Sequence, residues 1–159
     1  MTTLPSAATL RTPTSTKHLD DMRRMIRGEL PPPGVSKLVG LEFMSIDLGL
    51  SVFEMTAGPQ HANPMGTLHG GVLCDLADMA IGTAMASTLE DDESFTSLDL
   101  SVKFLKPIWN ARIRATAKMV KRTRSLGLLE CDVTDEGGSL VARLYSSCLV
   151  LRGADAHGR

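Results

Sequence analysis

The segment from His69 to Thr88 constrains the fold more than any other part of the sequence, because as a helix it is apolar on almost every side. A helix of this kind must be covered over most of its surface, whereas a surface helix carries one polar face. The rest of the chain offers mainly strands for that purpose. We therefore expect an α+β fold in which a strongly curved antiparallel sheet wraps around one long central helix.

Strands are predicted on both sides of this helix, because apolar and polar residues alternate there. Before the helix, the runs 41–47 and 50–57 are joined through Leu48 and Gly49, which is typical of a hairpin. After the helix, the alternation predicts an antiparallel meander with strands over 96–105, 111–121, 126–135 and 140–151.

An amphipathic N-terminal helix is predicted ahead of the hairpin. Its apolar positions recur at helical spacing and are Leu19, Met22, Ile26 and Leu30. The run PPPG at 31–34 is expected to end this helix, because proline has no N–H for the helical hydrogen bonds. We expect the helix to pack against the main body of the domain.

The chain of 159 residues, 43% of them hydrophobic, is long enough for one domain with its own core. That domain is expected over 17–152. Residues 1–16 are rich in Thr, Ser, Ala and Pro, so they are expected to form a flexible leader. Residues 153–159 are expected to form a flexible tail.

The formal net charge is −1, from 17 Lys and Arg against 18 Asp and Glu, so no overall field favours nucleic acid or an anionic membrane. The 3 cysteines lack a CxxC spacing, which indicates a reducing compartment and no structural metal. The N-terminus lacks the apolar run of a secretion signal, and no stretch has the apolar length of a membrane span. We expect a cytoplasmic protein with no nucleic-acid or membrane partner.

Asp78 belongs to a stripe of mostly small residues along the central helix. At about 100° per residue, that stripe contains Gly71, Cys74, Asp78, Gly82 and Met85. Small neighbours leave room beside the carboxylate for another molecule, which indicates a site. Two other interpretations of Asp78 stay open, a backbone cap and an interface contact. For Asp75, about 60° around the helix, a structural role is favoured.

The start of the same helix offers hydrogen-bond donors. Gly70 and Gly71 serve either close packing against another backbone or an open site, because the first N–H groups of a helix have no partner within it. Such donors, with the positive end of the helix dipole, suit a developing oxyanion. His69 beside them is either part of that site or an ordinary interior histidine.

The amide donor and the acid lie too far apart to act on one carbonyl within one chain. Gly70 and Asp78 are eight positions apart, which is roughly 12 Å along a helix. Two copies packed antiparallel bring Gly70 of one against Asp78 of the other. The spacing therefore predicts a twofold-symmetric homodimer with shared sites, alone or as half of a homotetramer.

The pattern N-x5-HGG-x7-D, formed by Asn63, His69, Gly70, Gly71 and Asp78, resembles the hotdog-fold acyl-CoA thioesterases of the PaaI-like branch. The resemblance covers about residues 40–151, including the order of the elements. It implies a hotdog fold and hydrolysis of a thioester between an acyl group and a pantetheine carrier, usually coenzyme A. It implies no cofactor, since coenzyme A is part of the substrate. A thioester mainly needs an oxyanion donor and one base, which suits these residue types.

The resemblance also implies a role for each matching residue. The Gly70 N–H polarises the thioester carbonyl, and His69 shapes that corner of the site. Asp78, from the other protomer, acts as general base on water or as nucleophile. Asn63 orients the water or the carbonyl. A hydroxyl near the acid supports it, and the candidates are Ser97 and, as its nearest rival, Thr96.

Substrate-binding candidates lie beside these residues and on one strand connection. Gly71 and Thr96 adjoin the catalytic candidates. For the nucleotide end of coenzyme A, the turn KRTRS and the end of the last strand offer cations and hydroxyls, namely Lys121, Arg122, Thr123, Arg124 and Arg152. A solvated charged turn without a ligand is an equally open interpretation. The acyl tail is expected along the interface between helix and sheet.

Two other functions remain as alternatives. A hotdog hydratase or dehydratase is disfavoured, because the Asp followed five residues later by His of many hydratases is absent from this sequence. A non-catalytic acyl-CoA binding or sensing protein uses the same pocket, but it normally lacks the acid and usually carries a DNA-binding segment. The short leader and the N-terminal helix do not resemble such a segment.

Overall fold

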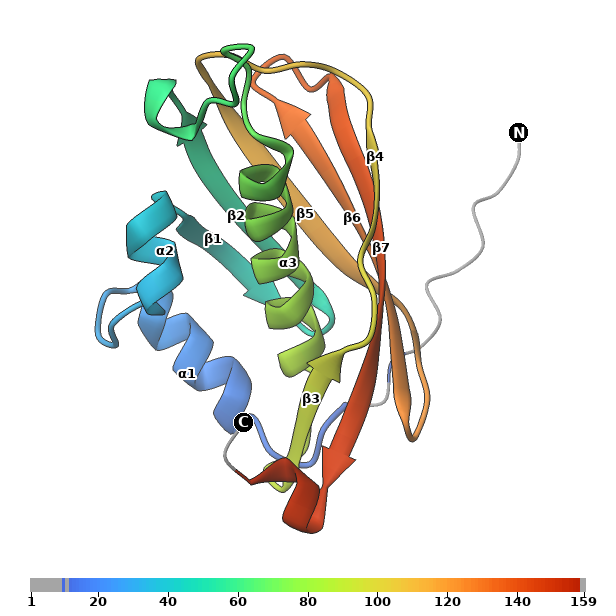
Figure 1. The fold of residues 1–159 in the computed structure, drawn as a ribbon. Coiled ribbons are helices and arrows are strands. Elements are labelled where there is room, and N and C mark those ends of the chain that lie inside the picture. Colours follow the sequence, from blue (N-terminus) through green and yellow to red (C-terminus); the bar gives the residue numbers. More distant parts are fainter. Residues whose placement is uncertain (1–9, 11, 158–159) are drawn as a thin grey trace, which may run out of the picture.

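Residue 10 and residues 12–157 are described in a computed structural model of the chain (Figure 1). One long helix, α3 (Gly70–Ala86), runs lengthwise along the concave side of a curled antiparallel sheet. Two short helices, α1 (Lys17–Ile26) and α2 (Gly34–Val39), lie beside it. The predicted α+β architecture, a curved sheet around one central helix with an N-terminal helix, is confirmed.

The sheet is antiparallel throughout, in the order β1-β2-β5-β6-β7-β3, with β4 also paired to β7. Its strands are β1 (Glu42–Asp47), β2 (Leu50–Ala57), β3 (Glu93–Ser97), β4 (Ser101–Phe104), β5 (Ala111–Arg122), β6 (Leu126–Asp135) and β7 (Leu140–Arg152). Short 3-10 turns follow β2 and β7, at Pro59–His61 and Gly153–Ala156. The hairpin and the strands β5, β6 and β7 match the predicted ranges to within about one residue at each end.

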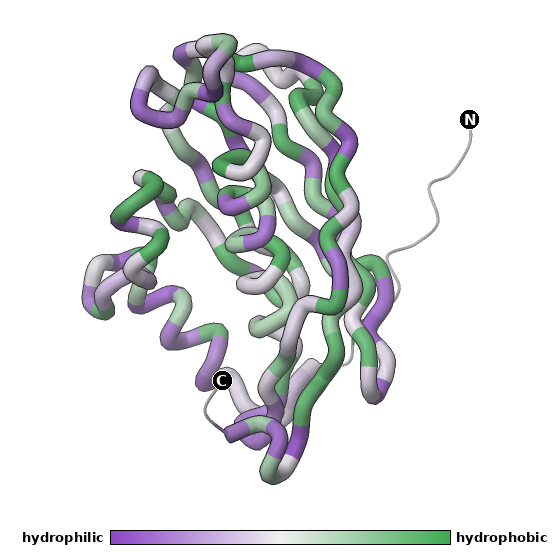
Figure 2. The backbone as a smooth tube through the Cα atoms, viewed as in Figure 1, coloured by the Kyte–Doolittle hydropathy of each residue, from purple (hydrophilic) through white to green (hydrophobic). Residues whose placement is uncertain are grey.

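The core lies between α3 and the concave face of the sheet. The buried side chains of α3 are Leu73, Leu76, Ala77, Ala80, Ile81, Ala84 and Met85. Met85 therefore belongs to the core and not to the accessible stripe that contains Asp78. The sheet strands alternate between hydrophobic and hydrophilic residues (Figure 2), and their inward positions, such as Ile113 and Leu129, cover the helix.

The N-terminal helix is shorter than predicted, and a second helix follows it. α1 ends at Ile26, because Gly28 takes a left-handed conformation (φ 74°) and donates its N–H to the Met25 carbonyl. The proline run then lies in the connection, and α2 begins directly after it. α2 is absent from the elements predicted above. This helix buries only Ser36, so it lacks the amphipathic repeat that a sequence pattern can reveal.

The strand predicted over 96–105 is wrong in its extent, because the chain forms two strands there. β3 begins at Glu93, at the end of the acidic run 90–93, and β4 begins only at Ser101. Asp99 causes the interruption: its carboxylate accepts the Ser147 N–H at 3.0 Å, and its carbonyl accepts the Ser146 hydroxyl at 2.7 Å. These bonds replace the ladder between the two strands.

Described residues ahead of α1 contact the domain. Leu10 packs against the hydrophobic core. The N–H and the hydroxyl of Thr14 both donate to the Glu90 carboxylate, at 2.9 Å and 2.6 Å. The leader expected over 1–16 lies largely outside the described residues, and its described part is held at these points. The expected tail starts with the second 3-10 turn, and its last two residues lie outside the described part.

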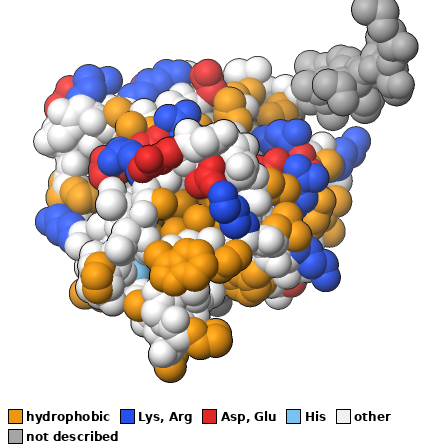
Figure 3. All heavy atoms as spheres, turned by 90° about the horizontal axis from the view of Figure 1, so that it is seen from above, with side chains coloured by type: hydrophobic (Ala, Val, Ile, Leu, Met, Phe, Trp, Pro, Cys, Tyr) orange, Lys and Arg blue, Asp and Glu red, His pale blue; other side chains and the backbone are white. Residues whose placement is uncertain are grey.

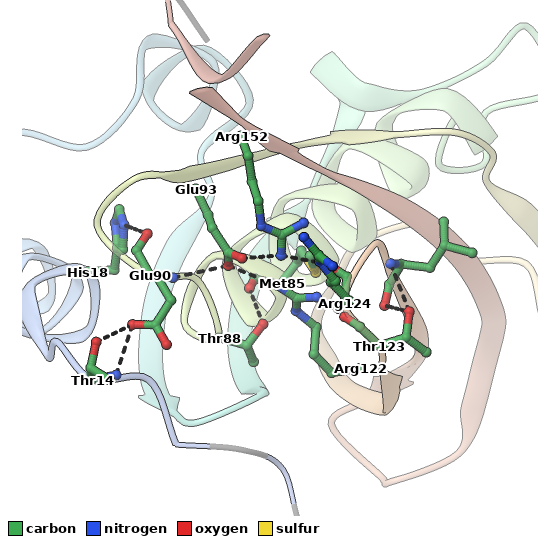
Figure 4. Close-up of polar contacts among 11 residues, drawn as sticks. Thr14, His18, Met85, Thr88, Glu90, Glu93, Arg122, Thr123, Arg124 and Arg152 are labelled. Carbon is green, nitrogen blue, oxygen red and sulfur yellow. Dashed lines mark hydrogen bonds and ion pairs between the residues drawn. The ribbon is translucent and has the colours of Figure 1, made fainter. Parts of the chain in front are cut away.

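A buried ion cluster joins β3 to the ends of β5 and β7 (Figure 4). Glu93 has a side chain that is 6% exposed, and it accepts hydrogen bonds from Arg122 at 2.9 Å and from Arg152. Arg152 also donates to the Arg124 carbonyl at 2.6 Å. Burial, opposed by the charge of Glu93, lowers the pKa of the Arg122 guanidinium. One carboxylate thus holds two arginines near the C-terminal end of α3.

Removal of Glu93 is expected to destabilise the domain. Glu93→Ala leaves the buried Arg122 without its counter-ion, and loss of one partner of a buried ion pair costs about 3 kcal/mol or more. Glu29→Ala, which breaks an exposed pair with Arg27, is the matched control and is expected to leave the unfolding midpoint unchanged. Chemical denaturation of both variants measures the difference. An unchanged midpoint for Glu93→Ala contradicts this account.

Candidate active site

The first turn of α3 is built around His69. His69 is the N-cap residue, and its Nδ1 accepts the Gly71 N–H at 2.9 Å. A Cβ on Gly71 would lie 3.0 Å from that nitrogen, so glycine gives the imidazole room to cap the helix. The His69 N–H donates to the His61 carbonyl at 2.8 Å, which fixes the preceding loop. The His69 side chain is exposed, so it is not an interior histidine.

The Gly70 N–H takes no part in the hydrogen bonds within α3. The first helical hydrogen bond runs from the Leu73 N–H to the His69 carbonyl, so the Gly70 N–H has no acceptor within α3. Phe104 packs against this backbone, and a Cβ on Gly70 would lie 2.9 Å from its ring. Gly70 lines a cavity of about 450 Å³ between the loop before α3 and the connection after β4. An acceptor in that cavity is therefore within reach of the helix N-terminus.

Asn63 organises the loop between β2 and α3. Its Oδ1 accepts the N–H groups of Met65 at 2.9 Å and of Thr67 at 3.2 Å. Its Nδ2 donates to the Thr67 hydroxyl at 2.8 Å and carries a second hydrogen that these bonds do not use. The side chain lines the same cavity as Gly70. The structure thus brings Asn63 and Gly70 together.

Asp78 lines a different cavity, of about 890 Å³, which α3 shares with β3 and the α1–α2 segment. In the part of the chain that the structure describes, no donor forms a hydrogen bond with its carboxylate. Partial burial first, and repulsion from Asp75 second, raise the pKa of the Asp78 carboxyl. A raised pKa matches a carboxylate better to proton transfer near neutral pH.

Thr96 and Ser97 lie at the end of β3 and line the cavity of Asp78. In the β3–β7 register, Ser97 is opposite Cys148. Burial raises the pKa of the Cys148 thiol, and the charge of Asp78 adds to that rise. The structure thus groups Asp78 with both hydroxyl candidates.

The two groups of predicted catalytic residues are separate within one chain. α3 is continuous from Gly70 to Ala86, so the step from Gly70 to Asp78 spans roughly 12 Å. Gly70 and Asp78 line separate cavities of the described residues. One chain therefore does not bring the predicted amide donor and the predicted acid to a common point.

The predicted nucleotide-binding residues lie near the C-terminal end of α3 and divide into two kinds (Figure 4). Arg122 and Arg152 are held by Glu93, and the Arg122 side chain is only 12% exposed. The other kind is exposed, namely Lys121 near the end of β5, and Thr123 and Arg124 on the turn between β5 and β6. The turn is therefore anchored by its buried arginine and presents its remaining cations to solvent.

Two features of the site were missed by sequence reasoning. Phe104 lies in the predicted strand 96–105, but the residue is 55% exposed and its ring packs against Gly70. Met25 and Ile26 of α1 line the cavity of Asp78. The amphipathic spacing of α1 was the available signal for the second feature, because its apolar face has to contact something. No local pattern links Phe104 to Gly70.

Hydrophobic side chains are exposed at the end of the domain where α3 begins (Figure 3). Leu105 and Trp109, in the connection after β4, are 57% and 56% exposed. Away from that end, at the edge of the sheet between β3 and β4, Leu98 is also 56% exposed. Grouped apolar surface of this kind marks interaction sites on soluble proteins.

The described residues contain neither a membrane-spanning helix nor a metal-binding cluster. None of their helices combines the length and the apolar character needed to cross a bilayer. No group of three or more His, Cys, Asp or Glu side chains among them is placed to hold a metal ion. Cys74, Cys131 and Cys148 are free thiols.

Residues 65–142 match the family described as the thioesterase superfamily. A 1,4-dihydroxy-2-naphthoyl-CoA hydrolase of Listeria monocytogenes is 29% identical over 117 residues, which cover 74% of this chain and 94% of that protein. The human acyl-coenzyme A thioesterase 13 is 26% identical over 131 residues, which cover 80% of this chain and 93% of that protein. Relatives with these names support thioester hydrolysis as the general activity.

Solved structures show the same fold. A phenylacetic acid degradation-related protein from Ralstonia eutropha has a TM-score of 0.73 at 29% identity, over 80% of this chain and 98% of that chain. The PaaI protein of E. coli has a TM-score of 0.76 at 22% identity, over 87% and 96% of the two chains, which concerns the fold alone. The chain therefore carries a thioesterase-superfamily domain with the hotdog fold. PaaI-like thioesterases are among its structural neighbours, so the predicted resemblance is confirmed.

Asp78→Asn is expected to stabilise the fold at neutral pH. The pKa of the Asp78 carboxyl is higher in the folded chain than in the unfolded chain. Between those two pKa values the folded state binds more protons, so wild-type stability falls as pH rises through that window. The variant is therefore expected to melt above the wild type at pH 7, with the difference vanishing below about pH 4. A variant that melts at or below the wild-type temperature at pH 7 contradicts this expectation.

Proposed function

We propose that the protein is an acyl-CoA thioesterase, which hydrolyses the thioester to a free acid and coenzyme A at sites shared between two protomers. It acts in the cytoplasm as a homodimer or as a homotetramer of two such dimers. The relatives named as CoA thioester hydrolases support the substrate class. The separation of Gly70 from Asp78 on one rigid helix supports the shared site, since neither cavity alone contains both groups.

The free edge of the sheet supports pairing of two copies. β3 and β4 lie at one end of the strand order and pair only with β7 among the described strands, so their other side offers unpaired backbone groups. Exposed Leu98 and Phe104 accompany that edge. A twofold axis there aligns the two α3 helices antiparallel and sets the Gly70 cavity of one protomer against the Asp78 cavity of its partner.

The proposed reaction uses one donor and one base. The Gly70 N–H and the positive end of α3 stabilise negative charge on the carbonyl oxygen as water adds to the carbon. Asp78 takes the proton of that water, which its raised pKa favours. When the tetrahedral intermediate collapses, the C–S bond breaks and the departing thiolate receives the proton. The alternative is direct attack by the Asp78 carboxylate on the carbonyl carbon, which expels the coenzyme A thiolate and forms a mixed anhydride; water then hydrolyses this anhydride to the free acid and restores the carboxylate.

The remaining polar residues position these groups. His69 holds the first turn through Gly71, and Asn63 holds the preceding loop with one N–H left for the carbonyl or the water. Ser97, or Thr96 beside it, supports the acid from β3. For the phosphates of coenzyme A, the exposed candidates at the end of β5 and on the turn after it are Lys121, Thr123 and Arg124. Arg122 and Arg152 anchor that turn through Glu93 and act on the nucleotide indirectly.

Release of free thiol from a panel of acyl-CoAs, read with a thiol reagent, tests the proposal. We expect release by the wild type and a loss of turnover on the order of 10²-fold or more in Asp78→Asn, because the base is removed. Asp75→Asn makes the same change one turn away and is the matched control, expected to keep turnover within about tenfold of the wild type.

The outcomes separate the candidate functions. If Asp78→Asn turns over acyl-CoA at the wild-type rate, Asp78 is neither the general base nor the nucleophile. Tight binding of acyl-CoAs without thiol release supports the non-catalytic binding alternative.

A further inference from the structure

One wall of the cavity beside Asp78 is formed by residues that are not part of the hydrophobic core. Its polar wall is formed by α3 and β3, and the facing wall is formed by α1 and the connection to α2, including Met22, Met25 and Ile26. No residue of α1 is fully buried, although these side chains form its apolar face. The apolar face of α1 is thus only partly covered by its packing on β1, and its remaining surface lines the cavity.

This facing wall lies outside the part of the chain that matches the thioesterase superfamily, which is residues 65–142. The acid and the hydroxyls of β3 lie inside that part. The acid and the hydroxyls thus belong to the segment that carries the family match, whereas α1 and its connection lie ahead of it. We expect the acyl preference to depend on the facing wall.

The volume of the cavity is larger than the volume of a small acyl group. It measures about 890 Å³. A chain of twelve carbons needs only about 360 Å³ if each carbon takes the volume of a water molecule in the liquid. A short acyl group would leave most of the apolar surface in contact with water, whereas a long chain covers it.

The side chains of the wall suit a flexible occupant. Methionine is unbranched and adapts to irregular shapes, and both Met25 of α1 and Met79 of α3 line this cavity. Phe43 and Phe53, which also line the cavity, stack on one another with ring centroids 4.4 Å apart. Each ring thus has one face already covered by the other, which leaves less aromatic surface for a flat ring to stack on.

We propose that the acyl group is an unbranched aliphatic chain of about eight carbons or more, and that α1 with the α1–α2 connection sets the preferred length. The inference rests on the proposed thioesterase activity and deepens it. The acyl chain runs from the thioester at Asp78 along α3, past Gly82, to the apolar face of α1.

The test compares kcat/KM for acyl-CoAs of four to sixteen carbons, with benzoyl-CoA as the aromatic probe, in the wild type and two tryptophan variants. Wild-type kcat/KM is expected to rise about two- to fourfold per methylene until the cavity is filled. Ile26→Trp fills the cavity, so it is expected to lower kcat/KM about tenfold or more for the twelve-carbon chain and to leave the four-carbon chain unchanged. Leu38→Trp is the control. Leu38 is on α2, is 85% exposed and lies outside the cavity, so this variant is expected to keep kcat/KM unchanged for both the twelve-carbon and the four-carbon chain.

The inference fails if wild-type kcat/KM is flat or falls with chain length, or if benzoyl-CoA has a higher kcat/KM than the straight-chain acyl-CoAs. It also fails if Ile26→Trp lowers kcat/KM for all substrates by the same factor. Absence of thiol release from every acyl-CoA overturns the proposed function instead. In that case displacement of a fluorescent dodecanoate probe by dodecanoyl-CoA decides the inference. Displacement weakened about tenfold by Ile26→Trp but not by Leu38→Trp supports the chain-length wall, and equal displacement contradicts it.

Discussion

The continuity of α3 is the constraint on which the rest of the structure depends. The helix must be covered because it is apolar nearly all round, and the curled sheet covers it on the concave side. Because the helix is straight and unbroken from Gly70 to Ala86, it also fixes the distance between the amide at its start and the acid in its middle. The element that builds the core therefore decides how the site is assembled. A second copy is the simplest source of the missing half.

The residues around the two ends of α3 and along its accessible side have different roles. The loop before it is held by Asn63 and His69, so the first amides are presented in a fixed geometry. The far end is closed by the ion cluster around Glu93, which ties β3 to β5 and β7. Along the accessible side, α1 leaves a cavity open beside Asp78 instead of packing into it. Rigid ends with an open side suit a site that must orient a thioester and still accept a long substituent.

Much of this structure could be predicted from the sequence where the pattern is local. The period of two gave β5, β6 and β7, and the helical period placed Gly70 and Asp78 on one helix at a known distance. Features that depend on contacts between distant residues were missed. The interruption at Asp99 depends on hydrogen bonds to β7, and the approach of Phe104 to Gly70 depends on how two loops meet. α2 was missed because it is short and buries only Ser36. The partner of the basic turn, Glu93, lay in a run that local composition marks as a linker.

Activity of a mixed dimer tests the central claim most directly. One chain carries Asp78→Asn and the other Gly70→Pro, which removes the N–H at the first helical position, where proline is tolerated. Gly70→Ala, which adds similar bulk against Phe104 but keeps the N–H, is the control for packing. With shared sites, each parental dimer is inactive, and the purified mixed dimer regains about half of the wild-type turnover because one of its two sites is intact. A mixed dimer as inactive as its parents, although it is folded and dimeric, would contradict the account.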